Sequence, residues 1–360
     1  MESPPSDGFK QLSISSFYPV LTPRNKPTHS QSPVHGEEEQ NFLQQNAISQ
    51  ISRSTDLPHT DSKGELAQAR DPRPQRSPAE MNRRMILSQV AKETKSLLPG
   101  LLDSMPHAPK DGYLISNPST LGSTFCPRFN NTTVKVVNGD SFDVAINLAN
   151  SSLIYGTRDA KPVCVLNMAN QWRAGGGWLN GAIAQEEELC YRSSLSFTLK
   201  LRYYPLGDFD AVYSPTVVVF RDNFQRGHRL MDIKKPDYLP VVSVVSVAAL
   251  QGPELDLSFT PPRYKHNTDR DFMKSKMRVI LRVAAYKKHR RLVLGAFGCG
   301  AFFNPKHEVA DCWAEVLKEK EFKGWWEHIV FAVIDDSARG AAAENGNLSV
   351  FQNKLDGLQV

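Results

Sequence analysis

Short, β-branched apolar runs alternate with longer segments of helical periodicity between residues 132 and 334, and this alternation limits the possible folds more than any other feature. The apolar runs are typical of strands, and strands connected through helices form a sheet with helices packed on it. We therefore predict an α/β domain with a sheet between helix layers. The predicted strands are residues 132–137, 162–168, 212–220, 241–249, 291–294 and 328–334, and the predicted helices are residues 141–149, 186–201, 268–289 and 304–320.

The part of the chain before this alternation has a different composition. Residues 1–76 are rich in Ser, Pro, Gln and Asn and contain neither Trp nor Cys, which predicts a disordered tail. A capping box at residues 77–80 predicts a helix that runs to about Leu98, where Pro99-Gly100 would end it. We thus expect a helical and loop extension over residues 77–131 and the main domain over residues 132–360.

Composition narrows the functional classes. The 360-residue chain has a net charge of +5, which is compatible with an anionic ligand or a nuclear location. Its five cysteines are widely spaced without a CxxC pair, so neither a disulfide framework nor a zinc site is expected. The first residues lack the apolar core of a signal peptide, and no apolar run is long enough to span a membrane. We expect a soluble intracellular protein that uses no metal or cofactor and contacts no membrane.

A glycine run, Gly175-Gly176-Gly177, directly follows the predicted strand 162–168. Glycines let a ligand approach the backbone N–H groups closely. Gln185, Glu186, Glu187 and Glu188 follow at the start of a predicted helix. Phosphates bind at such glycine-lined helix starts, and carboxyls can act on a glycosidic bond. This stretch therefore predicts a site for a phosphorylated, sugar-bearing ligand.

A second glycine-rich loop, residues 294–305, also lies between a strand and a helix. It matches neither the dinucleotide-binding fingerprint nor the P-loop, so nucleotide hydrolysis is disfavoured. Two such loops in one α/β domain suit a diphosphate held between them. Cys299 is read as a small spacer rather than a nucleophile, with His307 the nearest histidine, and Phe302 or Phe303 would stack on a base or line the sugar pocket. The residues predicted to hold the ligand here are Gly298, Cys299, Gly300, Ala301, Phe302 and Phe303.

Three consecutive acids cannot all face the ligand, because successive helical side chains are about 100° apart. An acid at a helix N-terminus is stabilised by the helix dipole alone, and Glu188 need do no more than this. A glycosidase needs one carboxyl that protonates the leaving oxygen and then activates water. Glu186 and Glu187 are the candidates.

The spacing of the three glycines and Gln185-Glu186-Glu187 resembles the signature of poly(ADP-ribose) glycohydrolases. Asn167-Met168-Ala169-Asn170 before it and Gly298-Cys299-Gly300-Ala301-Phe302 after it are similar to the microbial-type branch. The resemblance spans roughly residues 80–336. It implies a macrodomain-like three-layer α/β/α fold with a mixed sheet, and residues 132–360 would be the catalytic domain.

The resemblance also implies roles for individual residues. Glu187 would be the acid/base that cleaves the ribose–ribose O-glycosidic bond, and Glu186 would orient the adjacent ribose hydroxyls. Gln185 would fix the loop and Asn167 would contact the distal ribose. Gly175 to Gly177 and Gly298 to Phe302 would surround the ribose and the diphosphate. No metal is implied, and Glu188 leaves open which carboxyl carries the proton.

Two other functions remain open at this point. The site formed by Gly175 to Gly177 and Gln185 to Glu187, named here the cradle, would also serve an enzyme that removes single ADP-ribose units from proteins or nucleic-acid bases. It would also serve a macrodomain that binds ADP-ribose without cleaving it, although a binding module does not need the acids of Gln185-Glu186-Glu187. Poly(ADP-ribose) and poly(ADP-ribosyl)ated proteins are the expected substrates, and ADP-ribose is the expected product.

The tail contains one short motif, Gln11 followed by Ile14 and then Phe17-Tyr18. As a helical turn it would present Ile14, Phe17 and Tyr18 on one face. This resembles the motif that binds the PCNA sliding clamp, in which the apolar residues fill a pocket and the Gln binds beside it. We therefore expect PCNA as a partner, a role in DNA repair or replication, and a location in the nucleus and also in the cytoplasm.

Overall fold

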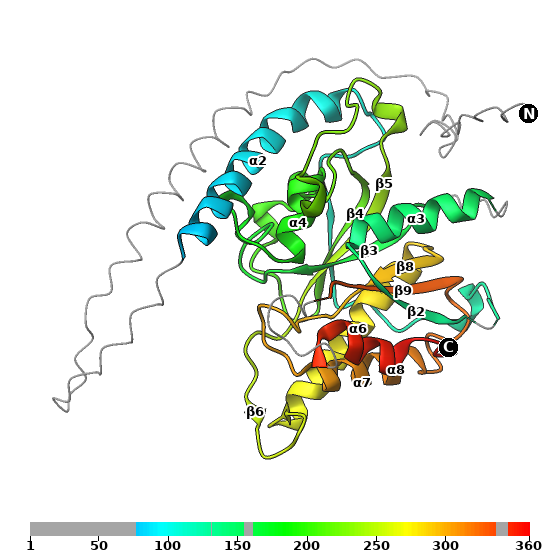
Figure 1. Cartoon of the computed structure of the whole chain (residues 1–360). Coiled ribbons are helices and arrows are strands. Elements are labelled where there is room, and N and C mark those ends of the chain that lie inside the picture. Colours follow the sequence, from blue (N-terminus) through cyan, green and yellow to red (C-terminus); the bar gives the residue numbers. More distant parts are fainter. Residues whose placement is uncertain (1–76, 131, 155–160, 336–344) are drawn as a thin grey trace, which may run out of the picture. The chain divides into compact units, whose positions relative to one another are not determined.

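The computed structural model of the chain describes residues 77–130, 132–154, 161–335 and 345–360. The predicted tail and its clamp motif lie outside these residues. The described residues are built on a seven-stranded sheet with the strand order β1-β4-β5-β3-β8-β9-β2 (Figure 1). A short ribbon of β6 and β7 lies apart from it. The strands are β1 Tyr113–Ser116, β2 Val134–Asn138, β3 Cys164–Ala169, β4 Asp210–Val218, β5 Val241–Ala248, β6 Leu255–Asp256, β7 Arg263–Tyr264, β8 Arg291–Leu294 and β9 His328–Val333.

The sheet is mixed, as predicted. Strand β3 runs parallel to both β5 and β8, with Val165 opposite Val244 and Val293. Strand β9 is parallel to β8 and to β2, whereas β4 is antiparallel to β5 and to β1. The carboxyl ends of β3, β5, β8, β9 and β2 therefore meet at one edge of the sheet. Ligands of open α/β sheets bind outside this edge.

Helices cover both faces of the sheet, which gives the three layers (Figure 1). The α-helices are α2 Pro78–Asp103, α3 Ser141–Ile154, α4 Gln185–Arg192, α5 Leu195–Thr198, α6 Asn267–Tyr286, α7 Lys306–Leu317 and α8 Asn347–Leu355. Short 3₁₀ turns are η2 Ser123–Phe125, η3 Trp178–Asn180, η4 Leu201–Tyr203, η5 Phe224–Arg226 and η6 Pro236–Tyr238.

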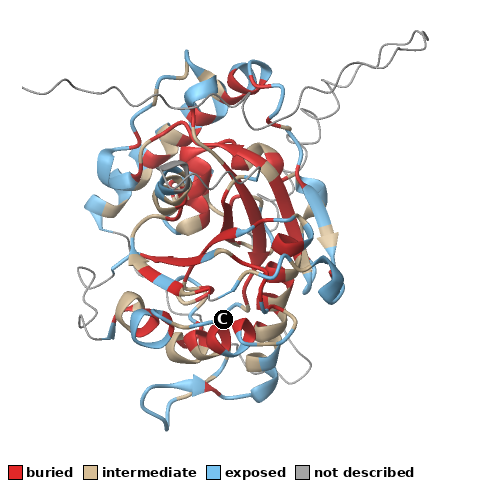
Figure 2. Cartoon of the chain, turned by 90° about the vertical axis from the view of Figure 1, so that its right-hand side faces the viewer, coloured by how far each residue is buried: buried red, intermediate tan, exposed pale blue. Residues whose placement is uncertain are grey.

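Alternating strand side chains enter two separate apolar cores. Cys164 and Leu166 of β3 belong to the core formed with α6, α7 and α8. Val163 and Val165 belong to the opposite core, formed with α3 and α4. Side chains alternate between the faces of a strand, so one continuous apolar run serves both layers. Figure 2 shows these central strands as buried and the outer turns of several helices as exposed.

Helix α2 extends beyond its predicted end. It continues through Pro99 to Asp103, although proline removes one helical hydrogen bond. Leu98, Leu101 and Leu102 follow the helical period across Pro99 and are buried in a third apolar cluster. Burying a leucine contributes about 1.5–3 kcal/mol, so this packing outweighs the proline.

The predicted helix 186–201 is divided into α4 and α5. Ser193 has extended backbone angles and forms a bridge with Val219, at the end of β4. The Ser194 hydroxyl accepts a hydrogen bond from Val218 N–H. These residues leave the helix because the edge of β4 offers their polar groups partners. Strand β1, in the predicted loop before residue 131, was also missed; it is a four-residue edge strand without apolar alternation.

None of the helices in the described ranges combines the length and apolar character needed to cross a bilayer.

Candidate active site

The glycine run lies in the loop that connects the carboxyl end of β3 to the first turn of α4. Gly175 and Gly176 have φ angles of +72° and +59°. Residues with a side chain rarely adopt such positive φ angles. A Cβ added to Gly176 would lie 2.4 Å from Glu187 Oε1. Glycine is therefore required at position 176 by both the backbone angle and the adjacent carboxylate.

Glu187 lies against this run. Its Oε1 accepts a hydrogen bond of 2.8 Å from Gly177 N–H. Its Oε2 has no hydrogen bond with any described residue. One oxygen is thus fixed by the cradle, while the other is available to a ligand.

Glu186 is held more completely. Its two oxygens accept hydrogen bonds from Asn170 N–H at 2.7 Å and from Asn167 Nδ2 at 3.3 Å. The residue is only 3% exposed. Burial, helped by the nearby charge of Glu187, raises the pKa of Glu186 to about 8 against the opposing effect of these hydrogen bonds. Glu186 is therefore largely neutral at pH 7.

Asn167, near the end of β3, is fully buried. Its Nδ2 also donates to Ser246 Oγ on β5, at 3.0 Å. Its Oδ1 is buried with no partner among the described residues. Rotating the amide by 180° would let Oδ1 accept the proton of a neutral Glu186, and the two orientations are equivalent in shape.

Gln185 joins the first turn of α4 to β3. Its Oε1 accepts from Met168 N–H at 2.9 Å, and its Nε2 donates to Leu166 O at 2.7 Å. The side chains of Gln185, Glu186 and Glu187 thus link the first turn of α4 to strand β3 and to the glycine loop. The structure brings these predicted residues together.

Glu188 faces a different set of partners. Its carboxylate accepts a hydrogen bond from Phe224 N–H at 2.9 Å and pairs with His228 Nε2 at 2.8 Å. These groups belong to the segment that follows β4. The side chain therefore supports that segment and leaves the cradle to Glu186 and Glu187.

The second glycine-rich loop is organised by Asn304. Its Nδ2 donates to Leu250 O at 2.7 Å and to Gly298 O at 3.0 Å, and its Oδ1 accepts from Tyr264 OH. Gly298 has φ +76°, and a Cβ there would meet Asn304 and Ala249. The loop after β8 is thereby packed against the end of β5. In the sequence Asn304 is only the first residue of a predicted helix, and its role in the loop was not predicted.

The two glycine loops follow neighbouring strands of the sheet, β3 and β8. A Cβ on Gly295, at the end of β8, would lie 3.3 Å from the terminal methyl of Met168 on β3. Phe302 packs partly against the core, whereas Phe303 is 72% exposed with a positive φ of 56°. Gly300 has open space around its Cα, and Ala301 is exposed. Of the two phenylalanines, Phe303 is the one available to a base.

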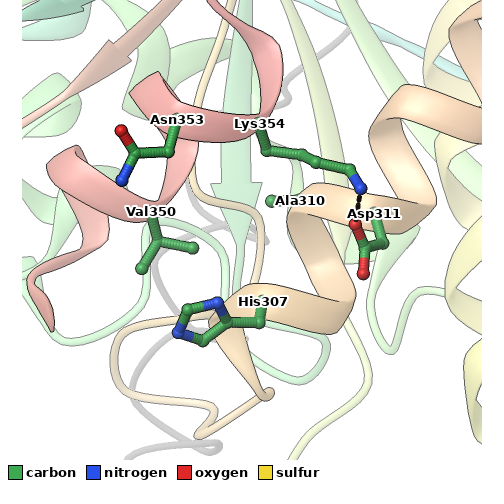
Figure 3. A pocket seen from close by; sticks show the side chains of 6 residues that line it. All are labelled: His307, Ala310, Asp311, Val350, Asn353 and Lys354. Atoms are coloured by element: carbon green, nitrogen blue, oxygen red, sulfur yellow. Dashed lines mark ion pairs between the residues drawn. The ribbon is translucent and has the colours of Figure 1, made fainter. Parts of the chain in front are cut away.

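Cys299 does not have the surroundings of a nucleophile. Burial raises the pKa of its thiol well above the usual range, and its Sγ contacts Phe297 O at 3.8 Å. His307 lies in a surface pocket between α7 and α8, beside Val350 and close to the Asp311–Lys354 ion pair (Figure 3). The structure shows no hydrogen bond between His307 and Cys299 within the residues it describes.

Several residues that support the two carboxyls were not predicted from the sequence. Asn170, whose N–H binds Glu186, was noted only as part of a family motif. Ser246 lies within an apolar strand, where nothing distinguishes it. Tyr204 has a buried hydroxyl without a partner in the described ranges, and burial together with the charge of Glu186 raises its pKa. Contacts between distant segments have no local signal in sequence.

Behind the site, the end of α4 is fixed by a buried arginine. Arg192 is fully buried and forms ion pairs with Asp140 and Asp143 at the start of α3. Asp140 Oδ1 also accepts a hydrogen bond from Phe142 N–H at 2.8 Å and so caps the start of α3. Among the described residues, no three His, Cys, Asp or Glu side chains form a metal-binding group.

The fold and the site define the class of protein. It is a macrodomain-like α/β domain in which two glycine loops follow neighbouring strands and a pair of carboxyls is buried beside the first loop. Comparison with known families is more specific. Residues 122–222 match the model of the microbial-type PARG catalytic domain, where PARG denotes poly(ADP-ribose) glycohydrolase. This range contains the glycine run and both carboxyls. No curated protein matches the chain significantly in sequence.

Solved structures of bacterial PARGs are similar to the whole described fold. A crystal structure of PARG from Thermomonospora curvata is 25% identical, with a TM-score of 0.57, and the match covers 76% of this chain and 99% of that chain. The same bacterium's PARG bound to the inhibitor ADP-HPD is 26% identical, with a TM-score of 0.57 and coverage of 76% and 98%. A PARG from Deinococcus radiodurans in complex with ADP-ribose is 26% identical, with a TM-score of 0.53 and coverage of 72% and 98%.

The resemblance to microbial-type PARG is thus confirmed: the family's catalytic-domain model matches residues 122–222, and the fold is similar to that of bacterial PARG structures. The predicted nuclear location is wrong. The matching family model is of the microbial type, and the similar structures come from bacteria, which have no nucleus. The basic net charge that was taken as compatible with a nucleus reflects no more than overall composition.

Proposed function

We propose that this chain hydrolyses the ribose–ribose O-glycosidic bonds of poly(ADP-ribose) and releases ADP-ribose. The substrate class follows from the bacterial PARGs that it resembles, which are described in complex with ADP-ribose and with ADP-HPD. One observation carries the assignment of the acid/base: Glu187 has one oxygen bound to Gly177 N–H and the other without a partner among the described residues.

In the proposed reaction, water attacks the anomeric carbon and the bond to the leaving ribose oxygen breaks. Glu187 gives its proton to that leaving oxygen and takes a proton from the attacking water, so that it ends each turnover as it began. Glu186 cannot do this as readily, because both of its oxygens already accept hydrogen bonds. Its role is to orient the ribose hydroxyls.

The neutral state of Glu186 has a consequence for its neighbour. Two ionised carboxylates in one buried site repel each other. With the pKa of Glu186 raised to about 8, the pair carries less negative charge at pH 7 than two ordinary glutamates would. The negative diphosphate can then approach the cradle.

The diphosphate is proposed to lie between the two glycine loops. The glycines of both loops leave the backbone open to a ligand, and the loops follow the carboxyl ends of parallel strands. Asn167 would contact the distal ribose through its amide, whose Oδ1 lacks a partner among the described residues. Gly298 to Phe302 would surround the diphosphate, and the exposed Phe303 would stack on the base.

Glu187→Gln tests the proposal, because glutamine keeps the shape but cannot transfer the proton. We expect the release of ADP-ribose from poly(ADP-ribosyl)ated protein to fall by about 10²–10⁴-fold. Glu188→Gln is the matched control, since that acid faces His228 instead; its activity should stay close to that of the parent. Full activity of Glu187→Gln would refute the assignment. Parallel assays on singly modified protein decide between polymer and mono-ADP-ribose as substrate.

We also propose that the tail motif, which lies outside the described residues, binds a sliding clamp and brings the enzyme to DNA under repair or replication. The spacing of Gln11, Ile14, Phe17 and Tyr18 supports this. Replacing Phe17 and Tyr18 by alanine should abolish capture of PCNA by the full chain while leaving hydrolysis unchanged. Undiminished capture would show that the motif does not bind the clamp.

A further inference from the structure

The loop between β3 and the glycine run contains a tightly fixed turn at residues 170–173, named here the Trp172 turn. Asn170 Oδ1 accepts hydrogen bonds from Trp172 N–H at 2.8 Å and Arg173 N–H at 3.0 Å. Gln171 exchanges two hydrogen bonds with the backbone of Leu206, at 2.9 and 3.1 Å. The turn is therefore held both from within and by the segment before β4.

This rigid turn presents an aromatic ring and a cation to solvent. Trp172 is 62% exposed. Arg173 is exposed next to it, and its guanidinium has no hydrogen bond or ion pair with any described residue. An exposed aromatic ring and an exposed cation on an already ordered turn can bind a ligand with little further loss of backbone freedom.

The turn is continuous with the cradle. Gly176 N–H donates to Arg173 O at 2.9 Å, and Asn170 N–H binds Glu186 Oε2. Trp172 and Arg173 thus lie on the chain between a residue that binds one carboxyl and the glycine beside the other. The turn is therefore part of the segment that surrounds the two carboxyls.

We propose that the Trp172 turn is a second binding site for poly(ADP-ribose), which takes the unit next to the one held in the cradle. This rests on the proposed function. Trp172 stacks on the purine base of that unit, and Arg173 pairs with its diphosphate. A base and a diphosphate recur together in each unit of the polymer, and they match an indole and a guanidinium in chemistry. The polar Asn170 turn offers no apolar groove that would favour a protein partner.

The site predicts a preference for polymer over monomer. Stacking of a base on an aromatic side chain contributes about 1–3 kcal/mol, which is about 5-fold to 150-fold in affinity. Free ADP-ribose has only one base and one diphosphate, and the cradle takes both. The Trp172 turn should therefore strengthen binding of long chains and leave monomer binding unchanged.

The test measures binding by the full chain carrying Glu187→Gln, so that the polymer stays intact. Long poly(ADP-ribose) and ADP-ribose monomer are the two probes, in separate titrations. Trp172→Ala and Arg173→Ala should each weaken polymer binding by about tenfold without changing monomer binding, and Trp172→Phe should retain most of it. Phe125→Ala and Lys135→Ala are matched controls, because Phe125 is 83% exposed on η2 and Lys135 is exposed on β2.

Equal polymer affinity in parent and Trp172→Ala would overturn the proposal. An equal loss for polymer and monomer would also overturn it, because the turn would then only maintain the cradle. The proposal would also be overturned if the parent chain bound no polymer. Hydrolysis by the unmutated chain is measured separately: if it releases no ADP-ribose, the proposed function fails, whereas the difference between polymer and monomer binding still decides the role of the turn.

Discussion

Replacing Glu186 by glutamine should remove a pH dependence from the stability of the folded chain. The pKa of Glu186 rises from 4.5 to about 8 on folding, chiefly through burial. Between these two values the unfolded chain has lost the proton and the folded chain keeps it. Because the folded state binds more protons, the free energy of unfolding must fall as the pH rises through this window.

The size of the effect follows from the shift. Each pKa unit corresponds to 1.36 kcal/mol, so this group alone should lower the free energy of unfolding by about 3 to 5 kcal/mol between pH 4.5 and pH 8. Glutamine is an isostere of the neutral acid and does not titrate. Its amide can be accommodated because Asn167 Oδ1, which has no partner among the described residues, can turn to accept from it.

The assay is denaturant unfolding of the parent and of Glu186→Gln at a series of pH values from 5 to 9. The difference in free energy of unfolding should grow with pH in favour of the variant and become constant above the folded pKa. Glu315→Gln is a control of opposite sign. Hydrogen bonds from Arg270 lower the pKa of Glu315 to about 2, so that acid contributes a pH dependence only below the range of the assay. A constant difference between Glu186→Gln and the parent across the series would refute the raised pKa.

Three further substitutions test the surrounding structure. Gly176→Ala should abolish hydrolysis, because its Cβ would lie 2.4 Å from Glu187 Oε1. Gly100→Ala on α2 is the control, since its added Cβ has nothing within 4 Å, and it should keep most activity; similar rates for both variants in a polymer assay would contradict this. Asn304→Ala should weaken ADP-ribose binding in calorimetry and cost about 1–3 kcal/mol in thermal unfolding, since Tyr264 loses its acceptor; unchanged binding would show that the second loop does not contact the ligand. Leu98→Ala should destabilise the chain by about 2–5 kcal/mol in denaturant unfolding, and a smaller loss would show that α2 is not held across Pro99 by packing.

The sequence predicts most of the sheet and the two glycine loops because their signals are local. The strand at residues 291–294 was placed as the structure has it, since a short apolar run bounded by basic residues and glycine has few alternatives. The course of α2 was not predictable in this way. Pro99 is a local signal for a helix end, whereas the burial of Leu101 and Leu102 against β4 depends on segments more than one hundred residues away.

The same distinction applies to the carboxyls. Helical geometry shows that three successive acids must diverge, but it does not say which of them faces the glycines. That depends on His228 and Phe224, whose segment is placed by β4 and binds Glu188. The partners of Glu186 likewise come from the chain before the glycine run. Sequence spacing identified the group of acids, and long-range packing selects among them.

Glu186 and Glu187 hold opposite ends of one loop, and this makes their roles interdependent. Glu186 binds Asn170 N–H and Glu187 binds Gly177 N–H, so the eight-residue segment 170–177 is attached at both ends to the first turn of α4. Removing either carboxyl releases one end of the loop that approaches the ligand. Effects of residues that act as a unit are not additive. The double variant Glu186→Ala, Glu187→Ala should therefore lose little more activity than Glu187→Ala alone, and a fully multiplicative loss in kcat/KM would show that the two carboxyls act independently.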